Sequence, residues 1–224
     1  MDTVKELAEQ ICEIGKRVYR NGFVAANDGN ISVRYDDTSI LTTPTATSKG
    51  FMTPEMIIHM SLGGKVLSNS AYKPSSEVKM HLAVYRENPD VNAVVHTHAP
   101  AATMLAVMHE PIERAYLPES VVLLGNVPVA EFALPGSERL GELVAPLAKT
   151  YNAALLANHG AVTWGADLQS AYFLMETLEY YAKIMLWSEL LPGRAKPLGR
   201  EQMDGLMALH DKLGYSKGGY PVSE

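Results

Sequence analysis

Segments with the spacing of amphipathic helices alternate with short apolar runs of strand type along the whole chain, and this alternation restricts the fold most. The first helix is predicted over Thr3–Asn21, where apolar residues recur every three or four positions before Gly22. Further helices are predicted at Thr53–Glu55, from caps at Ser75 and Ser76 to about Arg86, and over Ala99–Met108, Ser137–Thr150, Asp167–Leu191 and Arg200–Leu213. Strands are predicted over Ile31–Arg34, Ser39–Thr42, Lys65–Leu67, Val91–His98, Val127–Phe132 and Ala153–Ala157, with Gly160–Thr163 continuing the last.

No repeat or linker interrupts this alternation, and 224 residues are enough for one well-filled domain. The prediction is therefore a single α/β domain over residues 1–224, with a central, mostly antiparallel or mixed sheet covered by helices.

The charge and the cysteine content argue against several classes of protein. The chain carries 19 basic and 25 acidic residues, a formal charge of -6, which disfavours binding to nucleic acid or to an anionic membrane. Cys12 is the single cysteine, so no intrachain disulfide forms, and its helical surroundings indicate a packed side chain rather than a nucleophile. The N-terminus does not resemble a signal peptide and no uncharged apolar run could cross a bilayer, so we expect a cytoplasmic protein.

The strongest chemical signal is the sequence Val94-Val95-His96-Thr97-His98 at the end of a predicted strand. Residues two apart on a strand share a face, so both imidazoles can converge on one point. Imidazole is a favoured ligand of zinc and of neighbouring transition metals. On this pattern alone, a metal site and a structural role explain the two histidines equally well.

A third histidine, His159, stands between Asn158 and Gly160 where a buried apolar run ends. Functional residues of α/β folds often lie at strand ends. Catalytic metal sites typically combine three protein ligands with one open position, and His96, His98 and His159 would match that description. A hydrogen-bonded histidine at a strand end is the alternative for His159 taken by itself. The remaining histidines have no partner pattern and are interpreted as structural or exposed: His59, His81, His109 and His210.

The segment Lys73-Pro74-Ser75-Ser76-Glu77 offers two hydroxyls and free N–H groups at a predicted helix start. Such a start favours an anion, and Glu77 would lie beside it. An ordinary helix cap is the alternative. Two more segments precede or follow predicted strands: Asp28-Gly29-Asn30, where glycine permits close backbone approach, and the hydroxyl-rich Thr43–Ser48. An ordinary turn and a polar loop are the alternatives for these two.

Taken in this order, the motifs resemble those of the class II aldolase and adducin family, and within it the L-fuculose-1-phosphate aldolase type. The resemblance covers the chain from the first helix to about Leu191. The motifs that carry it are Gly29-Asn30-Ile31-Ser32, Thr43-Pro44-Thr45, Pro74-Ser75-Ser76-Glu77, His96-Thr97-His98 and Asn158-His159-Gly160.

The resemblance implies a zinc ion, or another divalent metal such as Mn2+ or Co2+, on His96, His98 and His159. Glu77 would be a fourth ligand at rest and a base during turnover. The implied phosphate pocket consists of Gly29, Asn30, Thr45, Ala46, Ser75 and Ser76. The resemblance also implies a homotetramer with active sites at subunit interfaces, where a tyrosine of the neighbouring subunit, matched here by Tyr116, handles the proton of the aldehyde. Alanine at position 46 departs from the usual glycine, and residues 214–224 match poorly, which leaves the aldehyde open.

The implied reaction cleaves a ketose 1-phosphate, such as L-fuculose 1-phosphate or a 5-deoxy or methylthio pentulose 1-phosphate. The products would be dihydroxyacetone phosphate and an aldehyde, formed through a metal-stabilised ene-diolate. Epimerases, dehydratases and decarboxylases of the family share the histidines; the epimerase type has aspartate in place of Glu77, whereas Glu119 keeps a dehydratase open. A non-catalytic adducin-like scaffold would need neither ligands nor base, and a structural zinc is disfavoured because such sites are usually rich in cysteine.

Overall fold

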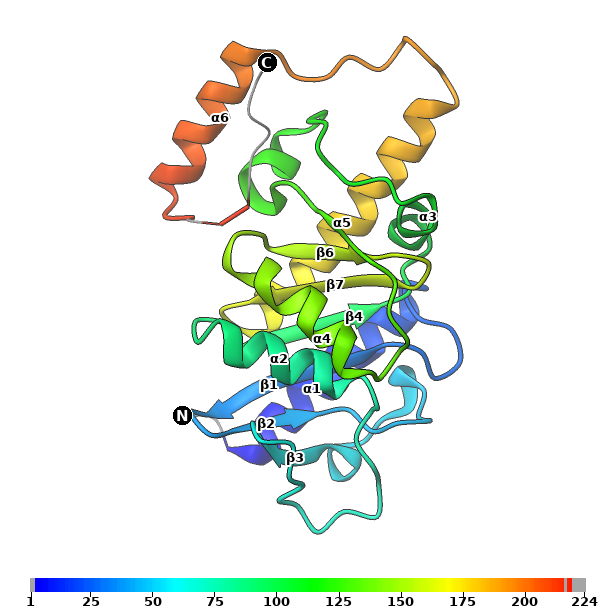
Figure 1. Cartoon of the computed structure of the whole chain (residues 1–224), viewed down its shortest axis with the longest axis vertical. Coiled ribbons are helices and arrows are strands. Elements are labelled where there is room, and N and C mark those ends of the chain that lie inside the picture. The colour runs from blue at the N-terminus through cyan, green and yellow to red at the C-terminus, as the bar shows by residue number, and fades with distance from the viewer. Residues whose placement is uncertain (1–2, 216, 219–224) are drawn as a thin grey trace.

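A computed structural model describes residues 3–215 and 217–218, and it shows a seven-stranded sheet with helices on both faces (Figure 1). The strands lie in the order β3-β2-β1-β4-β7-β6-β5. Their bounds are Asn30–Asp36 (β1), Ser39–Thr42 (β2), Ile58–Ser61 (β3), Ala93–Thr97 (β4), Val129–Ala130 (β5), Ala153–Leu156 (β6) and Gly160–Gly165 (β7). All neighbouring strands pair antiparallel except β5 and β6, which confirms the predicted α/β domain with a mostly antiparallel sheet.

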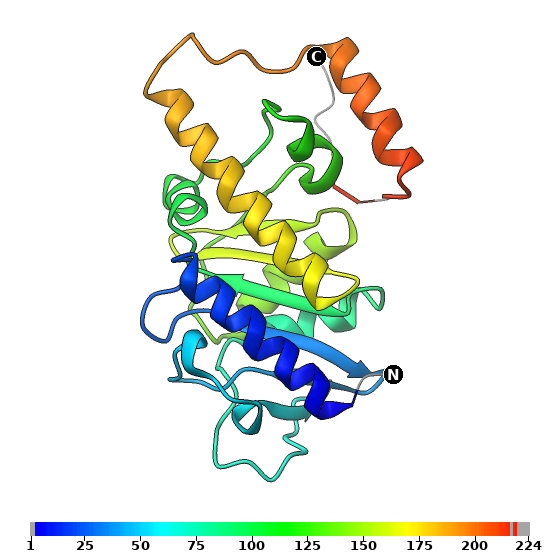
Figure 2. The same cartoon turned by 180° about the vertical axis from the view of Figure 1, so that it is seen from behind.

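The helices form two layers, with α2 and α4 on one face of the sheet and α1 and α5 on the other (Figures 1 and 2). The helices are α1 (Val4–Arg20), α2 (Val78–Glu87), α3 (Pro100–Met108), α4 (Glu138–Val144), α5 (Leu168–Glu189) and α6 (Arg200–Lys212). Shorter helical turns are η1 (Lys49–Phe51), η2 (Pro54–Met56), η3 (Ser120–Leu124) and η4 (Ala145–Lys149). Among the described residues, no helix combines the length and the apolar character needed to cross a membrane.

Side-chain alternation along the strands divides the core between the two faces. In β4, Ala93 and Val95 belong to the apolar cluster that includes α1 and α5, whereas Val94 belongs to the cluster of α2 and α4. His96 lies two residues after Val94, so its side chain points to the α2 face. A buried apolar strand thus presents a histidine to the helix that begins next to Glu77.

Two strand predictions are wrong. The edge strand is β3 rather than Lys65–Leu67, of which Val66 forms only an isolated bridge with Met60. The residues after Gly160 do not continue β6 but reverse and pair antiparallel with it as β7. Both errors concern pairing between strands, which a local pattern does not encode.

The predicted serine caps of α2 are also wrong. The N-cap is Glu77, and no side chain caps the first turn. The hydroxyl of Ser75 accepts hydrogen bonds from the Glu77 N–H at 3.4 Å and from Asn30 Nδ2 at 3.2 Å. The chain also forms a five-residue π-helical turn, η3, where no element was predicted. The first helix is confirmed, with a capping box between Thr3 and Glu6.

Glu179 of α5 is a buried carboxylate, 1 % exposed, that supports the helix after His98. Its oxygens accept the backbone N–H groups of Ala101 (3.0 and 3.2 Å) and Ala102 (3.0 Å) in the first turn of α3. Lys183 Nζ lies 3.2 Å from the same carboxylate. The first N–H groups of a helix need acceptors, and a negative charge complements the helix dipole there. This contact therefore ties α3 to α5.

Replacing Glu179 by alanine should lower the free energy of unfolding by about 2–4 kcal/mol, because buried N–H groups and Lys183 lose their acceptor. The matched variant Glu189→Ala on the same helix removes an exposed ion pair with Arg114 and should cost less than about 1 kcal/mol. Scanning calorimetry at one protein concentration measures both. Equal shifts of the two melting temperatures would contradict the structural role of Glu179.

Candidate metal centre and active site

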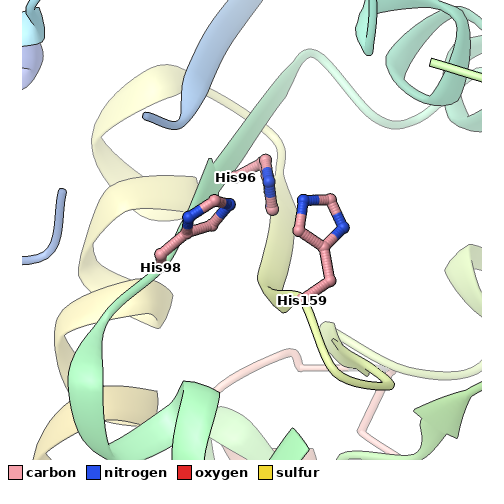
Figure 3. A group of neighbouring side chains, drawn as sticks. All are labelled: His96, His98 and His159. Carbon is pink, nitrogen blue, oxygen red and sulfur yellow. The ribbon is translucent and has the colours of Figure 1, made fainter. Parts of the chain in front are cut away.

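Three histidines from two segments meet at one end of the central strands (Figure 3). His96 is in β4, His98 follows its last residue, and His159 lies in the turn between β6 and β7. One ring nitrogen of each lies within 4.8 Å of the others, and the ring centroids are 4.8–5.1 Å apart. The structure therefore brings together all three predicted ligands.

The turn that carries His159 is closed by its own backbone. His159 N–H donates to the Leu156 carbonyl at 2.9 Å, and Asn158 adopts a left-handed conformation with φ 55°. Asparagine tolerates this conformation better than most residues, and its Oδ1 lies 2.7 Å from His109 Nε2. The turn thereby directs His159 toward His96 (Figure 3).

Gly160 lets this turn lie directly on β4. A Cβ at this position would lie 2.5 Å from the Thr97 carbonyl oxygen and 2.8 Å from His98 Cδ2. Atoms of these types cannot approach so closely, so any side chain would push the turn away from the histidines.

A main-chain carbonyl determines which ring nitrogen of His96 carries the proton. Its Nδ1 lies 2.8 Å from the carbonyl oxygen of Ala161, which can only accept, so Nδ1 carries the proton and Nε2 presents a lone pair. Burial, together with the neighbouring His159 and His98, lowers the pKa of His96 well below its ordinary value. The ring is therefore neutral, which metal ligation requires.

Buried nitrogens of the cluster have no hydrogen-bond partner in the described part of the chain. They are Nε2 of His96, Nε2 of His98 and Nδ1 of His159. Burial lowers the pKa of His159, opposed by the Glu77 carboxylate. Asp28 Oδ2 lies 3.3 Å from His98 Nδ1, a carboxylate contact of the kind that orients metal-binding histidines. Since buried polar atoms are normally paired, this donor set fits a divalent cation held by three imidazoles.

Glu77 holds its carboxylate against this cluster. Its Oε2 lies 3.5 Å from His96 Nε2 and its Oε1 lies 3.2 Å from His159 Nε2. Asn30 Nδ2 donates to Oε2 at 2.9 Å, and the side chain of Glu77 is 12 % exposed. A carboxylate placed in this way can ligate a cation, or exchange a proton with a substrate that takes its place.

The residues predicted to bind phosphate lie in loops, apart from Asn30 at the start of β1, and hydrogen bonds join these segments to each other. Asn30 stands opposite His96 in the sheet, and its Nδ2 contacts Ser75 Oγ as well as Glu77. The Thr45 N–H donates to the Lys73 carbonyl at 2.9 Å, which joins the loop before η1 to the loop before α2.

Two backbone positions in these loops favour glycine. Gly29 has φ 72°, and a Cβ there would lie 2.8 Å from the His96 carbonyl oxygen. Ala46 has φ 53°, so alanine here occupies the left-handed region that glycine adopts without cost.

Ser76 packs beside Gly136, where an added Cβ would approach Ser76 Cβ to 2.9 Å.

Tyr116 lies in the loop between α3 and η3. Its N–H donates to Tyr181 Oη at 2.8 Å, and its side chain hydrogen-bonds to Arg114, whose pKa it raises. Glu119 precedes η3 and is exposed. The sequence singled out both residues, and Tyr116 forms its hydrogen bonds with this loop and with α5 rather than with the histidines. Its catalytic role stays a prediction that depends on a second copy of the chain.

Two buried groups near the site were not predicted to have a role in it. Lys49 is 1 % exposed, although it follows a polar loop. His81, interpreted as structural, is buried with Nδ1 2.7 Å from Ser32 Oγ, and burial, with His96, lowers its pKa to about 3. The spacing of four residues from Glu77 could have placed His81 on the same face of α2, whereas no local pattern marks Lys49. The other histidines form hydrogen bonds with Ser39 (His59), Asn158 (His109) and the Val122 carbonyl (His210).

Comparison with known proteins agrees with this geometry. Residues 9–186 match the family described as Class II Aldolase and Adducin N-terminal domain. This chain belongs to the class II aldolase and adducin family. The family resemblance predicted from the motifs is thereby confirmed.

Its relatives within the family include different activities. A 3-oxo-tetronate 4-phosphate decarboxylase from Pectobacterium atrosepticum is 37 % identical over 180 residues, which cover 79 % of this chain and 82 % of that protein. An L-fuculose phosphate aldolase from Methanocaldococcus jannaschii is 34 % identical over 183 residues, covering 82 % and 97 %. The crystal structure of YgbL from Escherichia coli matches with a TM-score of 0.84 at 33 % identity, covering 92 % and 99 %. Family membership is thus compatible with aldol cleavage and with decarboxylation.

Replacing Gly160 by alanine should weaken zinc binding by about tenfold or more, because the added Cβ displaces the turn from Thr97 and His98. The matched variant is Gly205→Ala in α6, where a Cβ meets nothing within 4 Å, and its zinc affinity should equal that of the wild type. Competition with a chromophoric chelator measures both affinities. Unchanged zinc binding by the Gly160 variant would show that the close approach is not needed.

Proposed function

We propose that the chain is a metal-dependent carbon–carbon lyase that releases dihydroxyacetone phosphate from a small phosphorylated ketone. The observation that carries this proposal is the carboxylate of Glu77, which lies 3.5 Å from His96 Nε2 and 3.2 Å from His159 Nε2. Zinc, or another divalent cation such as Mn2+ or Co2+, would be held by His96, His98 and His159, with Glu77 as a fourth ligand at rest. When bound, the cation supplies Lewis-acid charge to the carbonyl and hydroxyl oxygens of the substrate.

The protein's own contribution is to hold and move one proton. Asn30 fixes Oε2 of Glu77 through a 2.9 Å hydrogen bond, so the direction of the carboxylate is set before substrate arrives. Glu77 takes up a proton from water or from a substrate hydroxyl, delivers it to the carbon that the broken bond leaves electron-rich, and removes it in the reverse direction. Burial disfavours the protonated forms of His96 and His159, which favours their neutral rings.

The phosphate anchors the substrate so that one carbon faces Glu77. The proposed pocket consists of Gly29, Asn30, Thr45, Ala46, Ser75 and Ser76. Two of these residues, Asn30 and Ser75, are hydrogen-bonded to each other, and Asn30 also contacts Glu77. A phosphate bound there would place the adjoining three-carbon unit beside the base.

Two leaving groups are compatible with this arrangement. In aldol cleavage of a ketose 1-phosphate, the hydroxyl next to the breaking bond loses its proton and an aldehyde departs. In decarboxylation of a 4-phospho-3-oxo acid, carbon dioxide departs and no such proton is removed. In each case the electron pair passes into the carbonyl to give the same ene-diolate, and protonation of carbon gives dihydroxyacetone phosphate.

Aldol cleavage of L-fuculose 1-phosphate, or of a 5-deoxy or methylthio pentulose 1-phosphate, is our first candidate reaction. Decarboxylation is the second candidate, and the 37 % sequence identity between this chain and a decarboxylase supports it. Epimerase and dehydratase activities of the same family are further alternatives. A non-catalytic scaffold is disfavoured because this chain keeps the three histidines and the carboxylate in contact.

A coupled dehydrogenase assay for dihydroxyacetone phosphate distinguishes these candidates. The zinc-loaded protein is incubated with L-fuculose 1-phosphate or with 3-oxo-tetronate 4-phosphate, with and without a chelator. Chelator-sensitive release from either substrate supports the lyase and identifies the leaving group. If neither phosphate, nor the 5-deoxy and methylthio pentulose phosphates, releases product, the lyase proposal is wrong.

Replacing Glu77 by glutamine should reduce turnover by about 10²–10⁴-fold, because the amide cannot exchange the proton. Zinc content should stay near that of the wild type, since three histidine ligands remain. Glu142→Gln is the matched control and should retain lyase activity, because this exposed side chain on α4 pairs with Arg139 and belongs to no part of the proposed site. Plasma emission spectrometry for zinc and the coupled assay give both readouts. Normal turnover by the Glu77 variant would remove this residue from the mechanism.

The tyrosine prediction requires a homotetramer in which Tyr116 reaches the site of a neighbouring copy. Large apolar side chains on α3 are about half exposed in the single chain, which supports such an assembly: Met104, Val107 and Met108. Tyr116→Phe should reduce aldol cleavage by about 10²-fold while leaving a decarboxylation unchanged, because only the aldehyde needs the proton. Tyr180→Phe is the control, because the Tyr180 side chain is exposed on α5. Mass photometry measures the oligomeric state of each variant. A monomer, or an aldolase unaffected by Tyr116→Phe, would refute this role.

A further inference from the structure

Lys49 is the only lysine or arginine among the described residues that is buried, with 1 % of its surface exposed. It begins η1, directly after the loop that contains Thr45 and Ala46. Burying an ammonium group costs desolvation free energy unless the group is hydrogen-bonded or paired with an opposite charge. No carboxylate of the described residues lies within ion-pair distance of its amine, so its partners are neutral acceptors.

The ammonium group joins the two loops on either side of the proposed phosphate pocket. Lys49 Nζ donates to the Asn27 carbonyl at 2.9 Å and to the Thr47 carbonyl at 2.6 Å. Asn27 lies two residues before Gly29, and Thr47 lies two residues after Thr45. An ammonium has three donors, and these two contacts use two of them.

The charge of Lys49 interacts electrostatically with residues of the proposed active site. Burial lowers the pKa of Lys49 to about 8, opposed by the nearby charges of Asp28 and Glu77, so the protonated amine predominates at neutral pH. Lys49 in turn contributes to the low pKa of His96. The hydroxyl of Ser48, in the same loop, is buried without a hydrogen-bond partner and is a free donor for an anion.

The residues around the proposed phosphate pocket are neutral or acidic, so binding a phosphate there requires a positive charge nearby. The six residues of the proposed pocket are uncharged, while Asp28 and Glu77 beside them are acidic. A phosphate ester brings up to two further negative charges, which these carboxylates repel. Lys73 is near in sequence, but its side chain is exposed and its charge is screened by solvent. Lys49 is the cation that the fold holds at a fixed place.

We propose that Lys49 is a positioning residue that holds the two phosphate loops together and supplies the fixed positive charge that selects phosphorylated substrates. This inference rests on the proposed function, because it assumes that the loops bind the phosphate. It adds a residue to the pocket and explains why a lysine is buried beneath neutral loop residues.

The test compares the binding of dihydroxyacetone phosphate and of unphosphorylated dihydroxyacetone to the zinc-loaded full chain by calorimetry. Lys49→Gln keeps an N–H donor for the two loop carbonyls and removes the charge. Its affinity for the phosphorylated ligand should fall by about tenfold or more, while that for dihydroxyacetone changes by less than about twofold. Equal losses for both ligands, or no loss for either, would overturn the proposal, because a purely structural lysine would not discriminate between them.

Lys73→Gln is the matched control, since it removes a charge from the same part of the sequence on an exposed side chain. Its preference for the phosphorylated ligand should stay within about twofold of the wild type. A loss of preference in this variant, with normal preference in Lys49→Gln, would assign the charge to Lys73 and refute our inference. A wild-type protein without any preference would instead refute the proposed phosphate pocket.

A measurement on the wild-type chain covers the case in which Lys49→Gln does not fold. With 13C-labelled lysine, the Cε resonance of Lys49, assigned by its loss in Lys49→Arg, should shift on addition of dihydroxyacetone phosphate. It should not shift with dihydroxyacetone. An unchanged resonance under saturating phosphorylated ligand would show that the ammonium does not sense the phosphate.

Discussion

The antiparallel register of β4 with its two neighbours is the constraint on which the site depends. It places Asn30 opposite His96 on one side and Ala161 opposite Thr97 on the other. A shift of one residue would turn His96 toward the α1 and α5 face and remove the acceptor of its Nδ1. Because β4 is buried on both faces, such a shift would also disturb the apolar packing of Val94. The packing that stabilises the sheet therefore also fixes the direction of the His96 ring.

The convergence of the three histidines could be predicted because period-two spacing and strand ends are local properties of a sequence. The alternation of helices and strands likewise predicted a mostly antiparallel α/β domain. Pairing between distant segments could not be predicted in this way. The edge strand β3, the reversal after Gly160 and the contact of Ser75 with Asn30 all depend on partners elsewhere in the chain. Burial of Lys49 is of the same kind, since its acceptor Asn27 precedes it by 22 residues.

Aldol cleavage and decarboxylation place the same demands on the cluster of histidines and on Glu77. Both need stabilised oxygen charge and one proton delivered to carbon. They differ in what departs, and therefore in the groups that surround the departing fragment. This explains how a decarboxylase and an aldolase can both be about one third identical to the same chain. In the proposed mechanism, the groups that distinguish the two reactions therefore lie outside the histidine cluster, and the loop of Tyr116 is the candidate for them.

The hydrogen bond from His96 to the Ala161 carbonyl has a consequence for how such a protein can diverge. The acceptor belongs to the backbone, so no exchange of the Ala161 side chain removes it while the β4–β7 pairing persists. The tautomer of His96 is thus independent of which side chain occupies position 161. Descendants of this fold can therefore change that side chain, and exposed loops elsewhere, without altering how the His96 ring presents its lone pair.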